Sequence, residues 1–120
     1  MHQKPITFLS RCPPYGKIRP QICLEMALAS AAFDQQVNYV FLDDGVYQLL
    51  KGQNAGAIGQ KTLGNAFEAL ILYGIENVIA DKESLSKRSI SISDLVIPVQ
   101  LSSREQITSL IDNSQAVFNL

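Results

Sequence analysis

The chain contains 120 residues, a length that suits one ordinary domain and is too short for two, so we expect residues 1–120 to form a single domain. Hydrophobic residues make up 47% of the composition and charged residues 18%, which is enough apolar material for a folded core and excludes a disordered chain. With 10 Lys and Arg against 11 Asp and Glu, the formal net charge of −1 lacks the basic excess that nucleic-acid binding rewards, so direct contact with DNA or RNA is not expected.

The first third of the chain alternates between strand and helix patterns. Residues 6–9 form a short apolar run that predicts a buried strand, and residues 10–16, with two prolines and a glycine, predict a loop at its carboxyl end. From residue 20 to residue 32, apolar side chains recur at the spacing of a helix packed on a sheet. Residues 37–42 are apolar at nearly every position, which is typical of a strand covered on both faces.

A short helix is predicted after this second strand. Asp44 has the position of an N-terminal cap, and Val46, Leu49 and Leu50 would share one face of the helix. Gly52 stands where a left-handed C-terminal cap would lie, and a glycine-spaced loop follows it.

The next segment repeats the pattern. Apolar spacing over residues 63–71 predicts a helix that Gly74 ends, and residues 77–80 predict the third strand. Residues 84–94 are polar and poorly periodic, so we expect a loop there. The apolar run 95–99 predicts an edge strand or a strand end, because Pro98 cannot donate a backbone hydrogen bond.

The end of the chain predicts one more helix and strand. Capping-box spacing occurs at residues 102–105 and again at 103–106, ahead of a helical stripe that begins at residue 107, and residues 116–120 predict the last strand. Strand and helix alternating about five times with short connections indicate a parallel sheet with helices on both faces. We therefore predict an α/β fold: a single-domain, three-layer α/β/α sandwich of flavodoxin-like type with a five-stranded parallel sheet.

In such a sheet, functional residues are expected beyond the carboxyl ends of the strands, which here means residues 10–16, residues 43–45 and the segment after Ala80. Asp43 and Asp44 allow two interpretations, a metal or acid-base pair and a turn followed by a helix cap. We favour the turn and cap, because neighbouring strand residues point to opposite faces.

Cofactor and metal chemistry have little support in the sequence. Neither GxGxxG nor GxxxxGK[ST] occurs, and the loop at residues 13–16 cannot supply the row of free N–H groups of a phosphate site. His2 is the single histidine, so Ser-His-Asp and Cys-His catalysis are poorly supported. No cluster of His or Cys has metal-site spacing, and we expect neither a cofactor nor a metal.

The two cysteines, Cys12 and Cys23, form neither a CxxC pair nor a disulfide framework, which favours a reducing compartment. Cys12 follows the first predicted strand and could face a helix N-terminus, where a lowered pKa would suit a persulfide carrier. A buried, inert thiol is the interpretation that we favour for it, and more strongly for Cys23. The first residues lack a signal-peptide pattern, and no apolar run reaches the roughly 20 residues of a membrane helix, which predicts a cytoplasmic protein without membrane contact.

Residues 40–53, VFLDDGVYQLLKGQ, resemble the DsrE/DsrF-like sulfur-relay family, and more narrowly its TusC/DsrF branch, in which a strand leads to Asp-Gly-Val, an aromatic residue, Gln-Leu-Leu and Gly-Gln. Residues 67–78, FEALILYGIENV, the Pro-x-Gly loop and residues 24–32 extend the resemblance over most of the chain, until it fades after residue 88. One departure is at residues 21–23, Gln-Ile-Cys, where the family's first helix often opens with Arg-Glu-Gly.

The resemblance implies a five-stranded α/β sandwich and a dimer of heterotrimers built from B-, C- and D-type subunits, or from E-, F- and H-type subunits. Such a complex passes persulfide sulfur toward 2-thiouridine of the tRNA wobble position through a downstream sulfur-carrier protein, or serves dissimilatory sulfur oxidation. The family's D- or E-type subunit carries the transferring cysteine after its third major strand, and the corresponding residues 77–81 contain none.

The resemblance therefore implies a non-catalytic, structural C- or F-type subunit that holds the catalytic partner. In this interpretation the catalytic residues are none, and five residues of the short helix region lie at the subunit interface: Asp44, Gly45, Tyr47, Leu49 and Leu50. The alternative that stays open is a sulfurtransferase that carries persulfide on Cys12.

Overall fold

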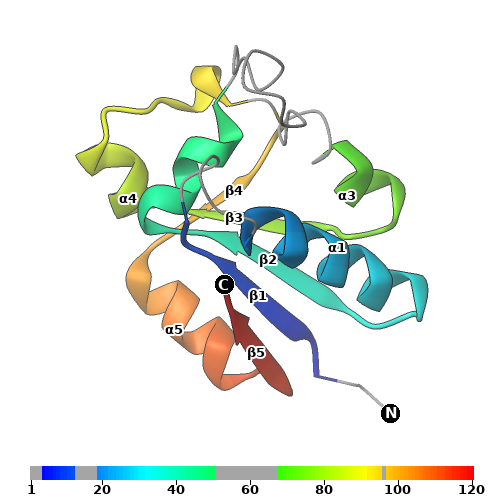
Figure 1. Cartoon of the computed structure of the whole chain (residues 1–120). Helices are drawn as coiled ribbons and strands as arrows, with labels where there is room; N and C mark the ends of the chain where they lie inside the picture. The colour runs from blue at the N-terminus through cyan, green and yellow to red at the C-terminus, as the bar shows by residue number, and fades with distance from the viewer. Residues whose placement is uncertain (1–3, 13–18, 51–67, 96) are drawn as a thin grey trace.

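The computed structural model describes residues 4–12, 19–50, 68–95 and 97–120, and within them five parallel strands form one sheet (Figure 1). The strands are β1 (Ile6–Ser10), β2 (Val37–Phe41), β3 (Asn77–Asp81), β4 (Gln100–Ser102) and β5 (Ala116–Asn119). The α-helices are α1 (Arg19–Ala32), α3 (Glu68–Leu72), α4 (Lys82–Lys87) and α5 (Arg104–Asp112), and two 3₁₀ helices are η1 (Asp43–Leu49) and η3 (Ile92–Asp94). The sheet has the order β4-β3-β2-β1-β5, which confirms the predicted fold class.

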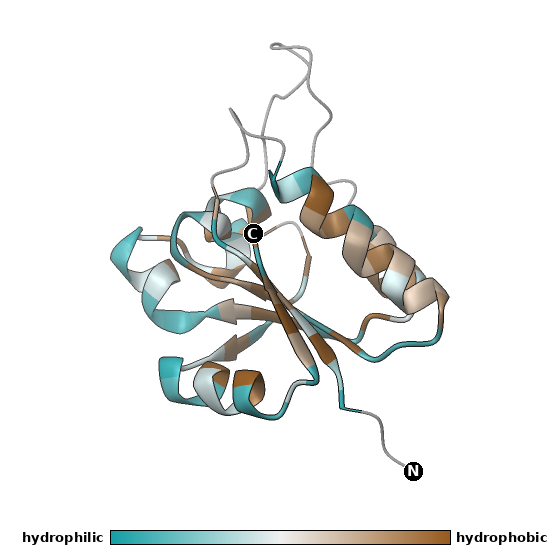
Figure 2. Ribbon diagram, turned by 60° about the horizontal axis from the view of Figure 1, so that its bottom comes forward, coloured by the Kyte–Doolittle hydropathy of each residue, from teal (hydrophilic) through white to brown (hydrophobic). Residues whose placement is uncertain are grey.

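Helices cover both faces of the sheet, as the predicted three-layer architecture requires. Figure 1 shows α1 and α3 on one face and α5 on the other. Adjacent strand residues point to opposite layers, so Phe8 belongs to the larger hydrophobic cluster beneath α1 and α3, whereas Leu9 packs with Ile107 of α5. Figure 2 shows hydrophobic residues concentrated in the strands at the centre of the molecule. No helix of the described residues is long and apolar enough to cross a membrane.

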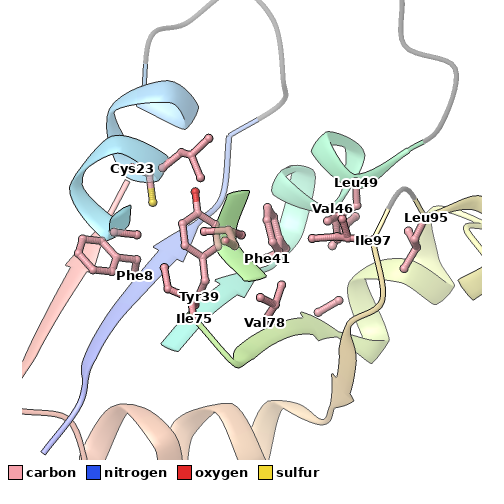
Figure 3. Close-up of a cluster of buried hydrophobic side chains, with 14 of the residues drawn as sticks. Phe8, Cys23, Tyr39, Phe41, Val46, Leu49, Ile75, Val78, Leu95 and Ile97 are labelled. Atoms are coloured by element: carbon pink, nitrogen blue, oxygen red, sulfur yellow. The ribbon is translucent and has the colours of Figure 1, made fainter. Parts of the chain in front are cut away.

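The core is centred on β2, whose five residues are all buried, as predicted for a strand covered on both faces. Figure 3 shows Tyr39 and Phe41 side by side in the larger cluster, with ring centroids 5.0 Å apart. Phe8 stacks on Phe118 of the edge strand β5 at a centroid distance of 5.2 Å. Burying a side chain of this size contributes about 1.5–3 kcal/mol, so β2 and its neighbours supply much of the folding energy.

Two predicted elements are wrong in position or type. Residues 84–94 were expected to form a loop, but α4 occupies the start of this segment, because the Asp81 side chain caps it by accepting a hydrogen bond from Ser84 N. The strand predicted at 95–99 lies instead at Gln100–Ser102. Pro98 lacks an N–H for the ladder, so regular pairing begins only after it.

The other predicted elements fare better. Ser103 and Gln106 form the capping box that opens α5, as one of the two predicted spacings required. Gly74 has a φ of +84° and follows the end of α3, in agreement with its predicted role. The proposed cap Gly52, the loop 52–59 and the first part of the helix predicted at 63–71 lie outside the described residues.

Candidate functional site

Four charged side chains meet beyond the carboxyl ends of the strands, at the place where the sequence predicted functional residues. Arg11 follows β1, Asp43 follows β2, Asp81 ends β3, and Arg104 opens α5 after β4. We call these four residues the charged cluster. Arg11 Nη2 lies 2.7 Å from Asp43 Oδ2, and Arg104 Nη2 lies 2.8 Å from Asp43 Oδ1. Arg104 Nε lies 2.7 Å from Asp81 Oδ2, so the four formal charges form one neutral chain.

Asp43 is the branch point of the charged cluster. Its φ of 53° lies in the left-handed region, an uncommon conformation for a residue other than glycine. Both carboxylate oxygens accept hydrogen bonds from arginine, and its backbone N–H donates to Ser84 Oγ at 2.9 Å. Partial burial alone would raise the pKa of the Asp43 carboxyl, but the hydrogen bonds from Arg11 and Arg104 outweigh it and hold that pKa below its ordinary value.

Asp81 is the buried member of the charged cluster, with no exposed surface. Its Oδ2 accepts hydrogen bonds from the hydroxyl and the backbone N–H of Ser84 and from Arg104 Nε. Its Oδ1 has no hydrogen-bond partner among the described residues. The hydrogen bond to Asp81 raises the pKa of Arg104 above its ordinary value, so this guanidinium keeps its charge throughout the physiological range.

Asp44 belongs to a separate ion pair and does not cap the short helix. The helix η1 has Leu42 as its N-cap, without a side-chain cap bond, and Asp44 lies inside its first turn. The Asp44 carboxylate accepts from Arg88 Nη2 at 3.0 Å and from Arg88 Nε at 3.2 Å. The Arg88 guanidinium also lies 5.8 Å from the centroid of the Tyr47 ring, so α4 is held against η1 by charge and by a cation–π contact.

Gly45 is required by a close approach of two backbones and not by a left-handed conformation. A Cβ atom at Gly45 would lie 1.9 Å from the carbonyl oxygen of Ser10, far inside van der Waals contact. That carbonyl already accepts a hydrogen bond from Leu42 N at 3.2 Å, so it is fixed in the pairing of β1 with β2.

The five predicted interface residues differ in exposure. Gly45 and Leu49 are buried within the chain's own core, Tyr47 and Leu50 are half-buried, and Asp44 is exposed. Leu50 also bridges Leu95 across an isolated antiparallel pair. An interface at η1 stays a prediction, with Asp44, Tyr47 and Leu50 as the residues that present surface.

Both cysteines lie near the buried polar residues Ser10 and Gln48. Cys12 is half-buried after β1, and its carbonyl oxygen accepts from Gln48 Nε2 at 2.8 Å. Cys23 is fully buried on α1 and hydrogen-bonds to Tyr39 and Ser10; Figure 3 shows it beside Tyr39. Burial raises the pKa of the Cys23 thiol to about 11, and the hydrogen bonds to Tyr39 and Ser10 only partly oppose this. Cys23 is thus an inert thiol at neutral pH, as the sequence suggested.

The charged cluster suits a structural role, in which it holds secondary-structure elements together, better than a catalytic one. Each arginine and each carboxylate of the charged cluster has an ion-pair partner within it, and no thiol belongs to it. Among the described residues, no group of three His, Cys, Asp or Glu side chains could hold a metal ion. The carboxyl-end rule located Arg11, Asp43 and Asp81, but Arg104 was missed; its place immediately after the capping residue Ser103 was the available signal.

Comparisons with known proteins place the chain beside sulfur-metabolism proteins. The model of the DsrE/DsrF-like family matches residues 4–120. The chain is 35% identical to the intracellular sulfur oxidation protein DsrF of Allochromatium vinosum, over 97% of this chain and 96% of that protein. It is 36% identical to a TusC homolog of Vibrio parahaemolyticus, over 85% and 86% of the two chains. Among solved structures, the ychN protein from E. coli has a TM-score of 0.86 at 19% identity and covers 98% of this chain, a likeness of fold alone.

Proposed function

Since this chain belongs to the DsrE/DsrF-like family, we propose that it is a non-catalytic subunit of a sulfur-relay complex that holds a sulfur-carrying partner. The observation that carries the proposal is at the end of β3. The family resemblance implies that a catalytic subunit has its transferring cysteine in the segment that corresponds to residues 77–81, whereas here that segment contains no cysteine and ends at Asp81, which is fully buried and paired with Arg104. A carboxylate cannot carry persulfide sulfur, and its burial leaves no room for a substrate thiol at that position.

The other half of the proposal concerns the thiols that the chain does have. Cys23 is buried, and its raised pKa keeps it protonated at neutral pH, so it is a poor nucleophile. Cys12 is the remaining candidate, and it is only half-buried. A sulfurtransferase that uses Cys12 therefore stays as the alternative, which the experiment below distinguishes.

The proposed complex is a cytoplasmic dimer of heterotrimers with B- and D-type subunits, in which sulfur passes to a downstream carrier protein and toward 2-thiouridine of the tRNA wobble position. A second candidate pathway is dissimilatory sulfur oxidation with E- and H-type partners. The 35% identity to DsrF supports this second pathway, and the 36% identity to a TusC homolog supports the first. The exposed part of η1, formed by Asp44, Tyr47 and Leu50, is a proposed contact with a partner subunit.

Reconstitution with the partner subunits from the same genome tests the assignment. The chain is co-purified with them, and sulfur transfer from a persulfide donor to the carrier protein is measured per mole of assembled complex. Transfer is expected to require assembly and to survive Cys12→Ala. Persulfide on Cys12, detected by intact mass and lost together with transfer in Cys12→Ala, would establish the alternative instead.

A further inference from the structure

A pocket of about 460 Å³ opens at the end of the sheet opposite the charged cluster. It lies where α3 ends and where β3 and β4 begin, and its walls include Ile71, Val78, Pro98 and Val99. Glu76 and Gln100 complete the lining as its polar members. A mostly apolar hollow with few polar groups is the usual form of a site that receives an apolar group.

The surface beside this pocket is unusually apolar. Three consecutive side chains at the end of α3 are more than half exposed, with Ile71 at 54%, Leu72 at 84% and Tyr73 at 57%. Ile71 belongs both to this exposed run and to the pocket wall, so the two form one continuous surface. Large exposed apolar side chains that adjoin each other mark an interaction site more often than scattered ones do.

The charge at the pocket is negative among the residues that the structure describes. Glu76 lies in the pocket lining, and the adjoining residues 68–80 and 97–103 contain the exposed Glu68 and neither Lys nor Arg. The neighbouring helix α1 has no basic residue in its last turn. Since the chain as a whole is nearly balanced, with a net charge of −1, this acidic rim is a local feature that a basic partner would complement.

The backbone beside the pocket can accept a further strand. β4 forms one edge of the sheet, and within the described residues it pairs only with β3. An edge strand presents a row of N–H and C=O groups to which an extended segment can add, while pockets for alternate side chains provide specificity.

We propose that this surface binds an extended segment of a partner protein, with an aliphatic or aromatic side chain in the pocket, Lys or Arg beside Glu76, and main-chain hydrogen bonds to β4. The proposal rests on the proposed function for the existence of a partner and names the surface that binds it. A second copy of this chain is disfavoured, because residues 68–80 and 97–103 offer no Lys or Arg that could pair with Glu76 of the other copy.

Two variants of the full-length chain and one matched control test the surface in assembly with the partner subunits. Ile71→Arg places a charge at the pocket, Glu76→Lys reverses the rim, and Phe33→Arg alters an equally apolar side chain that is 80% exposed at the end of α1. The first two are expected to weaken assembly by about tenfold or more, with Phe33→Arg close to wild type. If the complex forms and all three variants assemble like wild type, the surface proposal is overturned while the proposed function stands.

If the subunits fail to assemble, that failure counts against the proposed function alone. A peptide-binding measurement then still tests the proposed surface. The probes are two fluorescein-labelled hexapeptides, one alternating arginine with valine and leucine, the other with glutamate in place of arginine. Fluorescence polarisation should show that the wild type binds the basic peptide and that Glu76→Lys exchanges this preference for the acidic one. Equal binding of both peptides, no binding, or an unchanged preference in Glu76→Lys would overturn the proposal. Self-association by the same surface would appear as a dimer of the isolated chain that Ile71→Arg weakens, and it would overturn the choice of partner.

Discussion

Replacing Arg104 by methionine removes the charge that joins Asp81 to Asp43 while keeping an apolar stem of similar length. Asp81 would then lie fully buried with Ser84 as its remaining donor, whereas Asp43 would keep Arg11. Removing one partner of a fully buried ion pair costs about 3–5 kcal/mol. Because the Arg104 side chain is 47% exposed, water can reach part of the vacated space, and we expect a loss of about 2 kcal/mol in the free energy of unfolding.

Urea unfolding followed by circular dichroism at neutral pH measures this loss. With the slope of about 1–3 kcal/mol/M usual for small domains, Arg104→Met should lower the urea midpoint by about 1 M. Lys87→Met is the matched control, because the Lys87–Glu83 pair has side chains that are 69% and 54% exposed. That substitution should cost no more than about 0.5 kcal/mol. If the two variants were equally stable, the charged cluster would not be a structural joint, and our reasoning about Asp81 would be wrong.

Three further predictions follow from single side chains. Gly45→Ala should lower the free energy of unfolding by about 3 kcal/mol or prevent folding, because its Cβ would lie 1.9 Å from a fixed carbonyl oxygen. Gly74→Ala, at a φ of +84° with open space around it, should lower it by about 1 kcal/mol. Equal losses of stability in thermal melts of the two variants would contradict the clash at Gly45. Since the pKa of Asp43 is lowered on folding, its stabilisation is present above the unfolded value of about 4 and is lost as the pH falls below it. Urea titrations at pH 2.5–6 should therefore show a shallower acid loss in Asp43→Asn than in wild type, and parallel curves would refute this. Cys23 should resist iodoacetamide at about pH 8 until the protein is unfolded, because its pKa is about 11, and native labelling seen by peptide mass would show that the thiol is accessible.

The strands other than β4 were predictable because their signal is local. Residues of β2 are apolar and β-branched or aromatic almost without interruption, and such a segment is covered on both faces in nearly any fold that contains it. The helix α4 was not predictable in the same way. It has six residues, of which Ser84 and Leu85 are buried, so no apolar stripe reveals it. Its stability comes from the cap at Asp81 and the contacts of Arg88 with η1, and both depend on the assembled sheet.

The location of the candidate site was predictable, but its pairings were not. The rule that polar residues gather at the carboxyl ends of parallel strands requires only the order of elements, and it brought Arg11, Asp43 and the end of β3 together. Which cation meets which carboxylate depends on contacts between residues far apart in the chain. Arg104 is separated from Asp43 by 61 positions, and its place after the capping residue Ser103 does not indicate which carboxylate it will meet.

The adjacent residues Asp43 and Asp44 show why a motif alone does not decide between chemistry and architecture. As neighbours with two carboxylates they could serve as an acid-base pair. However, Asp43 has a left-handed φ of 53°, and the two side chains have different partners. Asp43 pairs with Arg11 and Arg104, while Asp44 pairs with Arg88 of the segment after α4. A general base must be able to take up a proton near neutral pH, but the pKa of Asp43 is held below its ordinary value and both of its oxygens are occupied. Asp43 and Asp44 therefore hold the end of β1, the end of α4 and the start of α5 against the start of η1, which is a structural role.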